Sequence, residues 1–188
     1  MERYGANTNI SANAEVIRNS GIDLGGNVFS NIYNIECFDS DGNLKWIDEV
    51  HNTVVNVGLN DVLNKYFKGS AYTAAHYVGL TDGTPTVAAA DTMASHAGWA
   101  EVTAYSEGVR QTLTLGTVAS QSVDNSAAKA VFSINGTVTV GGIFIALSPT
   151  KGETASILYG GGAFTGGDKA VGSGDTLNVT VTLTAAST

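Results

Sequence analysis

Three titratable side chains near the middle of the chain are the strongest candidates for chemistry. The run DTMASHAGWAE brings Asp91, His96 and Glu101 close together in sequence. Two carboxylates and an imidazole could hold a divalent ion or move protons. The same residue types also supply capping and turn hydrogen bonds in ordered loops. No histidine has a second histidine at metal-ligand spacing, so the loop interpretation is favoured and no metal site or cofactor is predicted.

Other motifs that could carry chemistry are incomplete. The run DSDGN at 39–43 starts like a calcium loop, but Leu44 stands where that loop requires glycine, so a hairpin turn is the better interpretation. Ser95 and His96 are neighbours and no G-x-S-x-G elbow is present, which disfavours a serine nucleophile. The glycine clusters near position 160 lack the lysine of a phosphate-binding loop. The sequence therefore predicts that the protein is not an enzyme and has no catalytic residues. A small hydrolase is the weakest of three functions considered, and the other two are described at the end of this section.

Aromatic side chains offer a different kind of site, because they can stack on a sugar ring or anchor a protein partner. The candidates are Tyr72, Tyr77, Trp99, Tyr105 and Tyr159. In a β protein most such residues belong to the core or to an interface. A glycan-binding site built from some of them is therefore an alternative rather than the leading hypothesis.

Short apolar runs with strand periodicity must position these groups. Strands are predicted at 28–38, 44–55, 75–80, 99–105, 109–118, 128–134, 138–140, 143–147 and 176–184. In the last run, Leu177, Val179, Val181 and Leu183 alternate with polar residues, which gives the strand one apolar face. Many short strands separated by turn residues predict a mainly β fold, an antiparallel β-sandwich of jelly-roll type.

Two glycine-containing pairs predict how the later strands connect. Asn135-Gly136 is the strongest short hairpin signal in the chain and predicts that the strands on either side pair with each other. The apolar parity changes across Gly141-Gly142, which predicts a bulge there.

One segment, about 57–68, has helical periodicity. Its large apolar residues follow the i, i+3, i+4, i+7, i+8 spacing of a single face, namely Leu59, Val62, Leu63, Tyr66 and Phe67. We expect this face to be buried against the sheets, with Gly69 ending the helix. On that expectation, truncating Leu63 to alanine would cost about 2–5 kcal/mol of stability.

The 81–98 segment that follows the next strand is a long loop, a type that is often functional.

Composition excludes several classes of partner. The formal net charge is −8, and the 9 lysines and arginines are scattered, whereas nucleic-acid binding needs clustered basic residues. The same shortage argues against an anionic membrane surface. Cys37 is the only cysteine, so an intrachain disulfide is excluded; the residue lies in an apolar strand and is predicted to be buried.

The start of the chain differs from the rest. Residues 1–27 are polar and weakly patterned, and we interpret them as an extended N-terminal arm ahead of a single domain at 28–188. Partner binding is predicted for the arm and for the 81–98 loop. The candidate residues are Ile10, Val16, Ile17, Ile22, Leu24, Met93 and His96.

Three blocks of this sequence resemble virion structural proteins of tailed bacteriophages. The first is NLKWIDEVHNTVVNVGLNDVLNKYF at 43–67, with its turn, strand and helix. The second is DTMASHAGWAEVTAYSEGVR at 91–110, and the third is FTGGDKAVGSGDTLNVTVTL at 164–183. The resemblance implies a structural role in the virion, with no enzyme activity and no catalytic residues to carry over.

Two functions are consistent with the resemblance. The first is a capsid decoration or cement protein that forms a homodimer or homotrimer, binds the major capsid protein and stabilises its lattice. The alternative is a tail or fibre component that binds a host surface glycan. Either protein would be made in the cytoplasm of the host bacterium and end in the virion, the first on the capsid surface.

Overall fold

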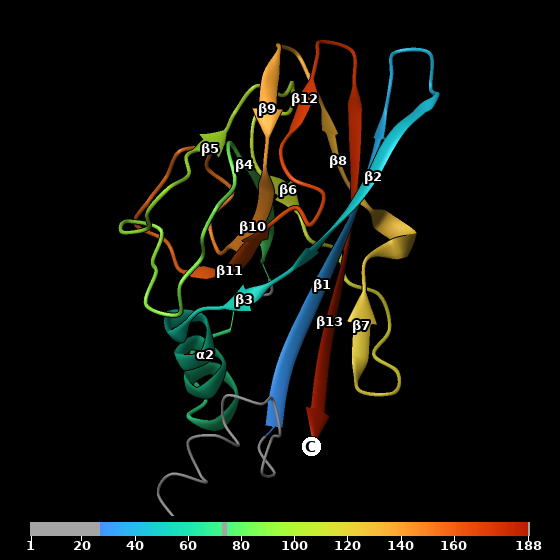
Figure 1. Cartoon of the computed structure of the whole chain (residues 1–188). Helices are drawn as coiled ribbons and strands as arrows, with labels where there is room; N and C mark the ends of the chain where they lie inside the picture. The colour runs from blue at the N-terminus through green and yellow to red at the C-terminus, as the bar shows by residue number, and fades with distance from the viewer. Residues whose placement is uncertain (1–26, 73–74, 188) are drawn as a thin grey trace, which may run out of the picture.

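The two larger sheets of this protein face each other across a shared core (Figure 1). The computed structural model describes residues 27–72 and 75–187. Within these residues the fold is mainly β and antiparallel, with one α-helix, as the sequence predicts. The first described strand, β1, begins at Asn27. The expected division into an arm at 1–27 and a single domain at 28–188 stays a prediction. The jelly-roll topology of the strands stays a prediction.

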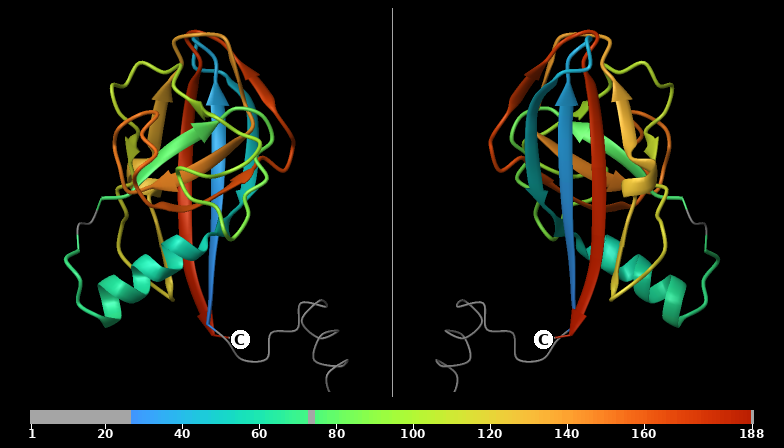
Figure 2. Two further views of the ribbon diagram at one scale, coloured as in Figure 1. Left: turned by 90° about the vertical axis from the view of Figure 1, so that its left-hand side faces the viewer. Right: turned by 90° about the vertical axis from the view of Figure 1, so that its right-hand side faces the viewer.

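The first sheet is built around the last strand. It has five strands: β2 (Leu44–His51), β1 (Asn27–Phe38), β13 (Thr176–Ser187), β7 (Ser122–Asp124) and β8 (Ala130–Ser133). On one side β13 pairs with β1 along its whole length, from Asn27 opposite Ser187 to Phe38 opposite Thr176. On its other side it pairs first with β8 and then with β7. Figure 2 shows β1 and β13 side by side down the full height of the molecule.

The second sheet has six strands and a buried centre. They are β3 (Thr53–Val54), β11 (Leu158–Ala163), β10 (Gly142–Ala146), β4 (Tyr77–Thr81), β5 (Glu101–Val102) and β6 (Gln111–Thr112). All five residues of β10 are buried, as is usual for a strand covered on both faces. A separate pair joins β9 (Val138–Val140) to β12 (Lys169–Val171), and a 3₁₀ turn, η2 (Ser126–Ala128), precedes β8.

Alternation along the strands fills the core. Tyr33, Ile35 and Cys37 of β1 point inward, and so do Leu177 and Val179 of β13, as the period of two requires. They meet Ile143 and Ile145 of β10 and Leu80 of β4 from the other sheet. Burial raises the pKa of the Cys37 thiol to about 11, so this cysteine behaves as the small buried hydrophobe that was expected.

The prediction of a hairpin at Asn135-Gly136 is wrong. β8 pairs with β13, whereas β9 pairs with β12, so the two residues connect strands that are not partners. Beyond β9 the chain passes from the small sheet into the second sheet at Gly141, where a bulge was expected. A Cβ atom at Gly141 would lie 1.6 Å from the carbonyl oxygen of Gly83, so only glycine fits this crossing.

The helical segment lies where the sequence predicts it. α2 (Asn56–Val62) continues into a π-helical turn, η1 (Leu63–Phe67), and Gly69 adopts a φ of +68°, which favours glycine, just after the helix ends. A Cβ atom at Gly58 would lie 2.6 Å from the Tyr159 carbonyl oxygen, so the first turn of α2 packs closely against β11. From that contact the helix runs outward from the sheets (Figure 2).

Candidate functional site

Asp91, His96 and Glu101, the candidate cluster against which loop contacts were favoured, have separate roles in the structure. The Asp91 carboxylate accepts a hydrogen bond from the Ala88 N–H at 2.9 Å, which is a turn contact. Glu101 instead pairs with Arg110. Among residues 27–72 and 75–187, no three His, Cys, Asp or Glu side chains gather in a way that could hold a metal ion.

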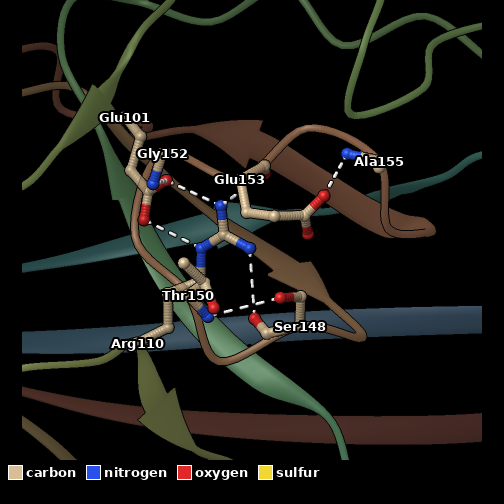
Figure 3. A network of polar contacts seen from close by, with 7 residues as sticks. All are labelled: Glu101, Arg110, Ser148, Thr150, Gly152, Glu153 and Ala155. Atoms are coloured by element: carbon tan, nitrogen blue, oxygen red, sulfur yellow. Dashed lines mark hydrogen bonds and ion pairs between the residues drawn. The ribbon is translucent and has the colours of Figure 1, made fainter.

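Arg110 is the centre of a buried polar network (Figure 3). Its Nε and Nη2 atoms donate to the two Glu101 carboxylate oxygens at 2.9 and 2.7 Å, a bidentate arrangement. The other side-chain hydrogen bonds of Arg110 go to the carbonyl oxygens of Ser148 and Glu153. The Gly152 N–H donates to Glu101 as well. The network fixes the 148–153 loop to β5 and leaves the guanidinium with no access to solvent, so we interpret it as structural.

The two predicted partner residues of the 81–98 loop lie in different environments. Met93, predicted to contact a partner, is 2% exposed and lies in a small core with Val55, Phe144 and Leu158. It is therefore not on the surface of the folded domain. His96 is half-buried and stacks on Trp99, with ring centroids 3.6 Å apart. Burial lowers the pKa of His96, and the Asp91 carboxylate opposes that shift. A partner contact at His96 stays a prediction.

The remaining predicted partner residues lie outside the part of the chain that the structure describes. They are Ile10, Val16, Ile17, Ile22 and Leu24.

The apolar face predicted for the helix is largely exposed, which corrects the expectation that it is buried. Leu63, Tyr66 and Phe67 are 54, 80 and 73% exposed, respectively, and Leu59 and Val62 are only half-buried. The tyrosine and phenylalanine rings contact each other edge to face at 5.0 Å. We call Leu63, Tyr66 and Phe67 the helix patch. Because contiguous exposed apolar surface marks interaction sites, this patch is the first part of the candidate site.

Replacing Leu63 with alanine should change the free energy of unfolding by less than about 0.5 kcal/mol, because more than half of the residue is already exposed to water. Urea denaturation of the two proteins measures this difference. A loss of several kcal/mol would mean that the side chain is buried in solution, for example against a second copy.

Beside the helix lies an apolar groove. It consists of two adjoining hollows of about 510 and 310 Å³ that share Tyr159 and Leu183. The helix forms one wall with Val62, Lys65 and Tyr66, and Tyr72 and His76 extend it. The floor and the far end are formed by Phe29, Leu113, Leu115, Val118 and Ile145. The volume of the larger hollow is in the range of ligand sites, and its lining is mainly aliphatic and aromatic.

A few polar groups converge on this apolar lining. The rings of His76 and Tyr159 meet edge to face at 5.4 Å. The pKa of His76 is lowered by burial, and the nearby Asp61 carboxylate partly opposes this shift. The pKa of Tyr159 is raised, first by burial and then by Asp61. At neutral pH the groove therefore presents a neutral imidazole and phenol beside Asp61, groups that orient a ligand by hydrogen bonds rather than by charge alone.

Comparison with known proteins does not assign this site. No family model matches the chain, and no curated protein matches it. Among the described residues, no helix is long and apolar enough to cross a membrane. The site therefore has to be interpreted from its own geometry.

Sequence reasoning found the helix patch but assigned it to the core. Helical periodicity shows which residues share a face, and it does not show whether another element covers that face. The aromatic candidates also fall into exposed and core positions that the sequence does not separate. Tyr72 and Tyr159 line the groove, whereas Trp99 and Tyr105 are core residues. Tyr77 is half-buried in β4.

Proposed function

We propose that this chain is a structural protein of a tailed-bacteriophage virion, a capsid decoration or cement protein that binds and stabilises the major capsid protein lattice. The helix patch carries the proposal. A monomeric soluble protein gains nothing from holding a phenylalanine and a tyrosine in water at the tip of a helix. Aromatic anchors of this kind are instead typical of the energetic centre of a protein interface.

The architecture suits a role that depends on geometry rather than on reactive groups. A two-sheet core is a rigid support, and the close contact at Gly58 fixes the helix on β11. The patch is therefore held at one end of the domain. In this proposal the partners are the major capsid protein and further copies of the chain, as a homodimer or homotrimer on the capsid surface.

Binding to empty capsid shells tests the proposal. Shells assembled from the major capsid protein should bring down the full-length chain on sedimentation. The combined variant Leu63→Ser, Tyr66→Ser and Phe67→Ser should bind at least about tenfold more weakly, since anchor residues of an interface each contribute on the order of 1–2 kcal/mol or more.

A matched control uses two other exposed apolar residues. Leu44 and Ile47 of β2 are also exposed, and they lie outside the candidate site. Replacing both with serine should leave binding unchanged. Equal binding by the patch variant and the wild type would contradict the proposed surface, and a copy number in isolated virions far below the number of lattice sites would contradict the cement role.

A second function, binding of a host surface glycan by a tail or fibre component, is favoured by one observation. Tyr72 and Tyr159 line the groove together with Asp61 and His76, which places aromatic rings beside hydrogen-bonding groups. The aliphatic floor makes this the weaker candidate, because sugars offer mainly hydroxyl groups. A glycan array probed with the wild type and with Tyr72→Ala tests it: binding that the variant loses supports this function, and no binding to any glycan argues against it.

A further inference from the structure

The groove beside the helix has an aliphatic floor that is partly open to solvent. Four residues form this floor, namely Leu113, Leu115, Ile145 and Leu183. The two hollows share Leu183, so the apolar surface continues from the larger hollow into the smaller one, where Val118 is 70% exposed. Removing such a surface from water drives the binding of an apolar chain. The shape and lining of the groove therefore favour an elongated aliphatic ligand.

Hydrogen-bond acceptors gather at the helix end of the same groove. The Asp61 carboxylate affects the pKa values of both His76 and Tyr159, so it lies near both rings, and Tyr72 acts on Tyr159 in the same way. A carboxylate only accepts hydrogen bonds, a neutral imidazole has one accepting nitrogen, and a phenol oxygen can accept as well as donate. A ligand group that only donates hydrogen bonds matches this set best.

The negative charge of Asp61 has no counterion among the described residues. None of the ion pairs in that part of the chain includes it. Lys65, the cation of the groove wall, donates instead to the carbonyl oxygen of Ala71. The rings of Tyr66 and Tyr72 line the same hollow, and aromatic faces attract cations. This end of the groove is therefore complementary to a positive charge.

An ammonium group combines both requirements, because it carries a positive charge and three donors and has no acceptor. A carboxylate at the same place would meet the like charge of Asp61, which disfavours a fatty acid. An uncharged alcohol would leave the charge of Asp61 without a counterion. The head of the ligand is thus set by charge and donor count, and its tail by the aliphatic floor.

We propose that the groove binds a small cationic amphiphile, an aliphatic primary amine whose ammonium group lies at Asp61, Tyr159 and His76 and whose chain lies on the aliphatic floor. Charge, donor count and lining each support this assignment. The inference goes beyond the proposed virion role and does not depend on it, since the site is formed by the groove rather than by Leu63 and Phe67 of the helix patch.

Titration of the full-length protein with octylammonium, followed by the NMR signals of the Leu113 and Leu183 methyl groups, tests the site. The probe should bind in one saturable equilibrium. Hexylammonium should bind on the order of tenfold more weakly, because two fewer methylene groups leave water. Octanoate, which has a tail of similar length and the opposite charge, should bind at least about tenfold more weakly than octylammonium.

The variant Asp61→Asn tests the position of the head. It should weaken octylammonium binding at least about tenfold, because hydrogen bonds to a charged group are the strong ones, and it should leave the binding of uncharged 1-octanol unchanged. The matched control is Asp41→Asn, which removes the same charge from the turn between β1 and β2, at the opposite end of the molecule from α2 (Figure 1). This control should bind octylammonium like the wild type.

Three results would overturn the proposal. The first is equal affinity of Asp61→Asn and the wild type for octylammonium, and the second is equal affinity of the wild type for octylammonium and octanoate. The third is tighter binding of the peptide acetyl-Leu-Lys-Leu-amide than of octylammonium, which would identify a lysine-bearing protein segment as the occupant instead of a small molecule.

Discussion

Replacing Arg110 with methionine should lower the free energy of unfolding by about 3–5 kcal/mol, because it leaves a buried carboxylate without its partner. The guanidinium is fully buried, and the side chain of Glu101 is 8% exposed. Methionine fills a similar volume but cannot donate to Glu101 or to the carbonyl oxygens of Ser148 and Glu153. Equilibrium unfolding in urea measures the loss, provided that the dependence of the unfolding free energy on urea concentration is the same for the variant and the wild type.

The double variant Arg110→Met, Glu101→Met separates the two causes of that loss. Removing both charges should recover much of the stability, since most of the single-variant cost comes from the uncompensated carboxylate. Arg110 also lies over the Phe144 ring at 5.2 Å, a contact that the methionine side chain partly replaces. A single variant within about 1 kcal/mol of the wild type would show that water reaches the pair in solution.

Replacing Asn125 with leucine should cost about 2–5 kcal/mol, because two buried backbone groups of β13 lose a side-chain hydrogen bond and an apolar side chain takes its place. Along β13, pairing with β8 ends at Val179 and pairing with β7 begins at Thr182. The Asn125 side chain bridges this gap. Its amide donates to the Val179 carbonyl at 3.2 Å, and its oxygen accepts the Val181 N–H at 2.6 Å.

A local measurement separates this mechanism from general destabilisation. In Asn125→Leu the Val181 amide should lose protection from hydrogen exchange by more than its neighbours in β13 do. Asn34 is an exposed asparagine on the adjacent strand β1, so Asn34→Leu is the matched control and should stay close to the wild type in stability. Retained protection at Val181 in Asn125→Leu would mean that another group replaces the amide.

Local pattern predicts the elements well where one face is buried. The alternation of Leu177, Val179 and Val181 predicts the position and the inner face of β13. The D-G turn after β1 also forms where predicted, with the Asp39 carboxylate accepting the N–H groups of Asp41 and Asn43. These features depend on neighbouring residues, which the sequence displays directly.

Prediction fails where a distant segment decides the outcome. Asn135-Gly136 has the composition of a hairpin, yet the flanking strands find better partners in β12 and β13. Glu101 was weighed as a member of a cluster with His96, and turn contacts were favoured instead; in the fold its carboxylate pairs with Arg110, which neither interpretation included. In both cases a tertiary contact outweighs a weak local preference.

The sequence by itself determined the β class, the inner faces of the long strands, the helix bounds and the shortage of basic residues. These follow from periodicity, turn chemistry and charge, which are properties of neighbouring residues. Only the tertiary structure decided that Met93 is core, that Arg110 is buried against Glu101, and that Leu63, Tyr66 and Phe67 face water beside a groove. Burial depends on which segments cover a side chain, and those segments lie far away in the sequence.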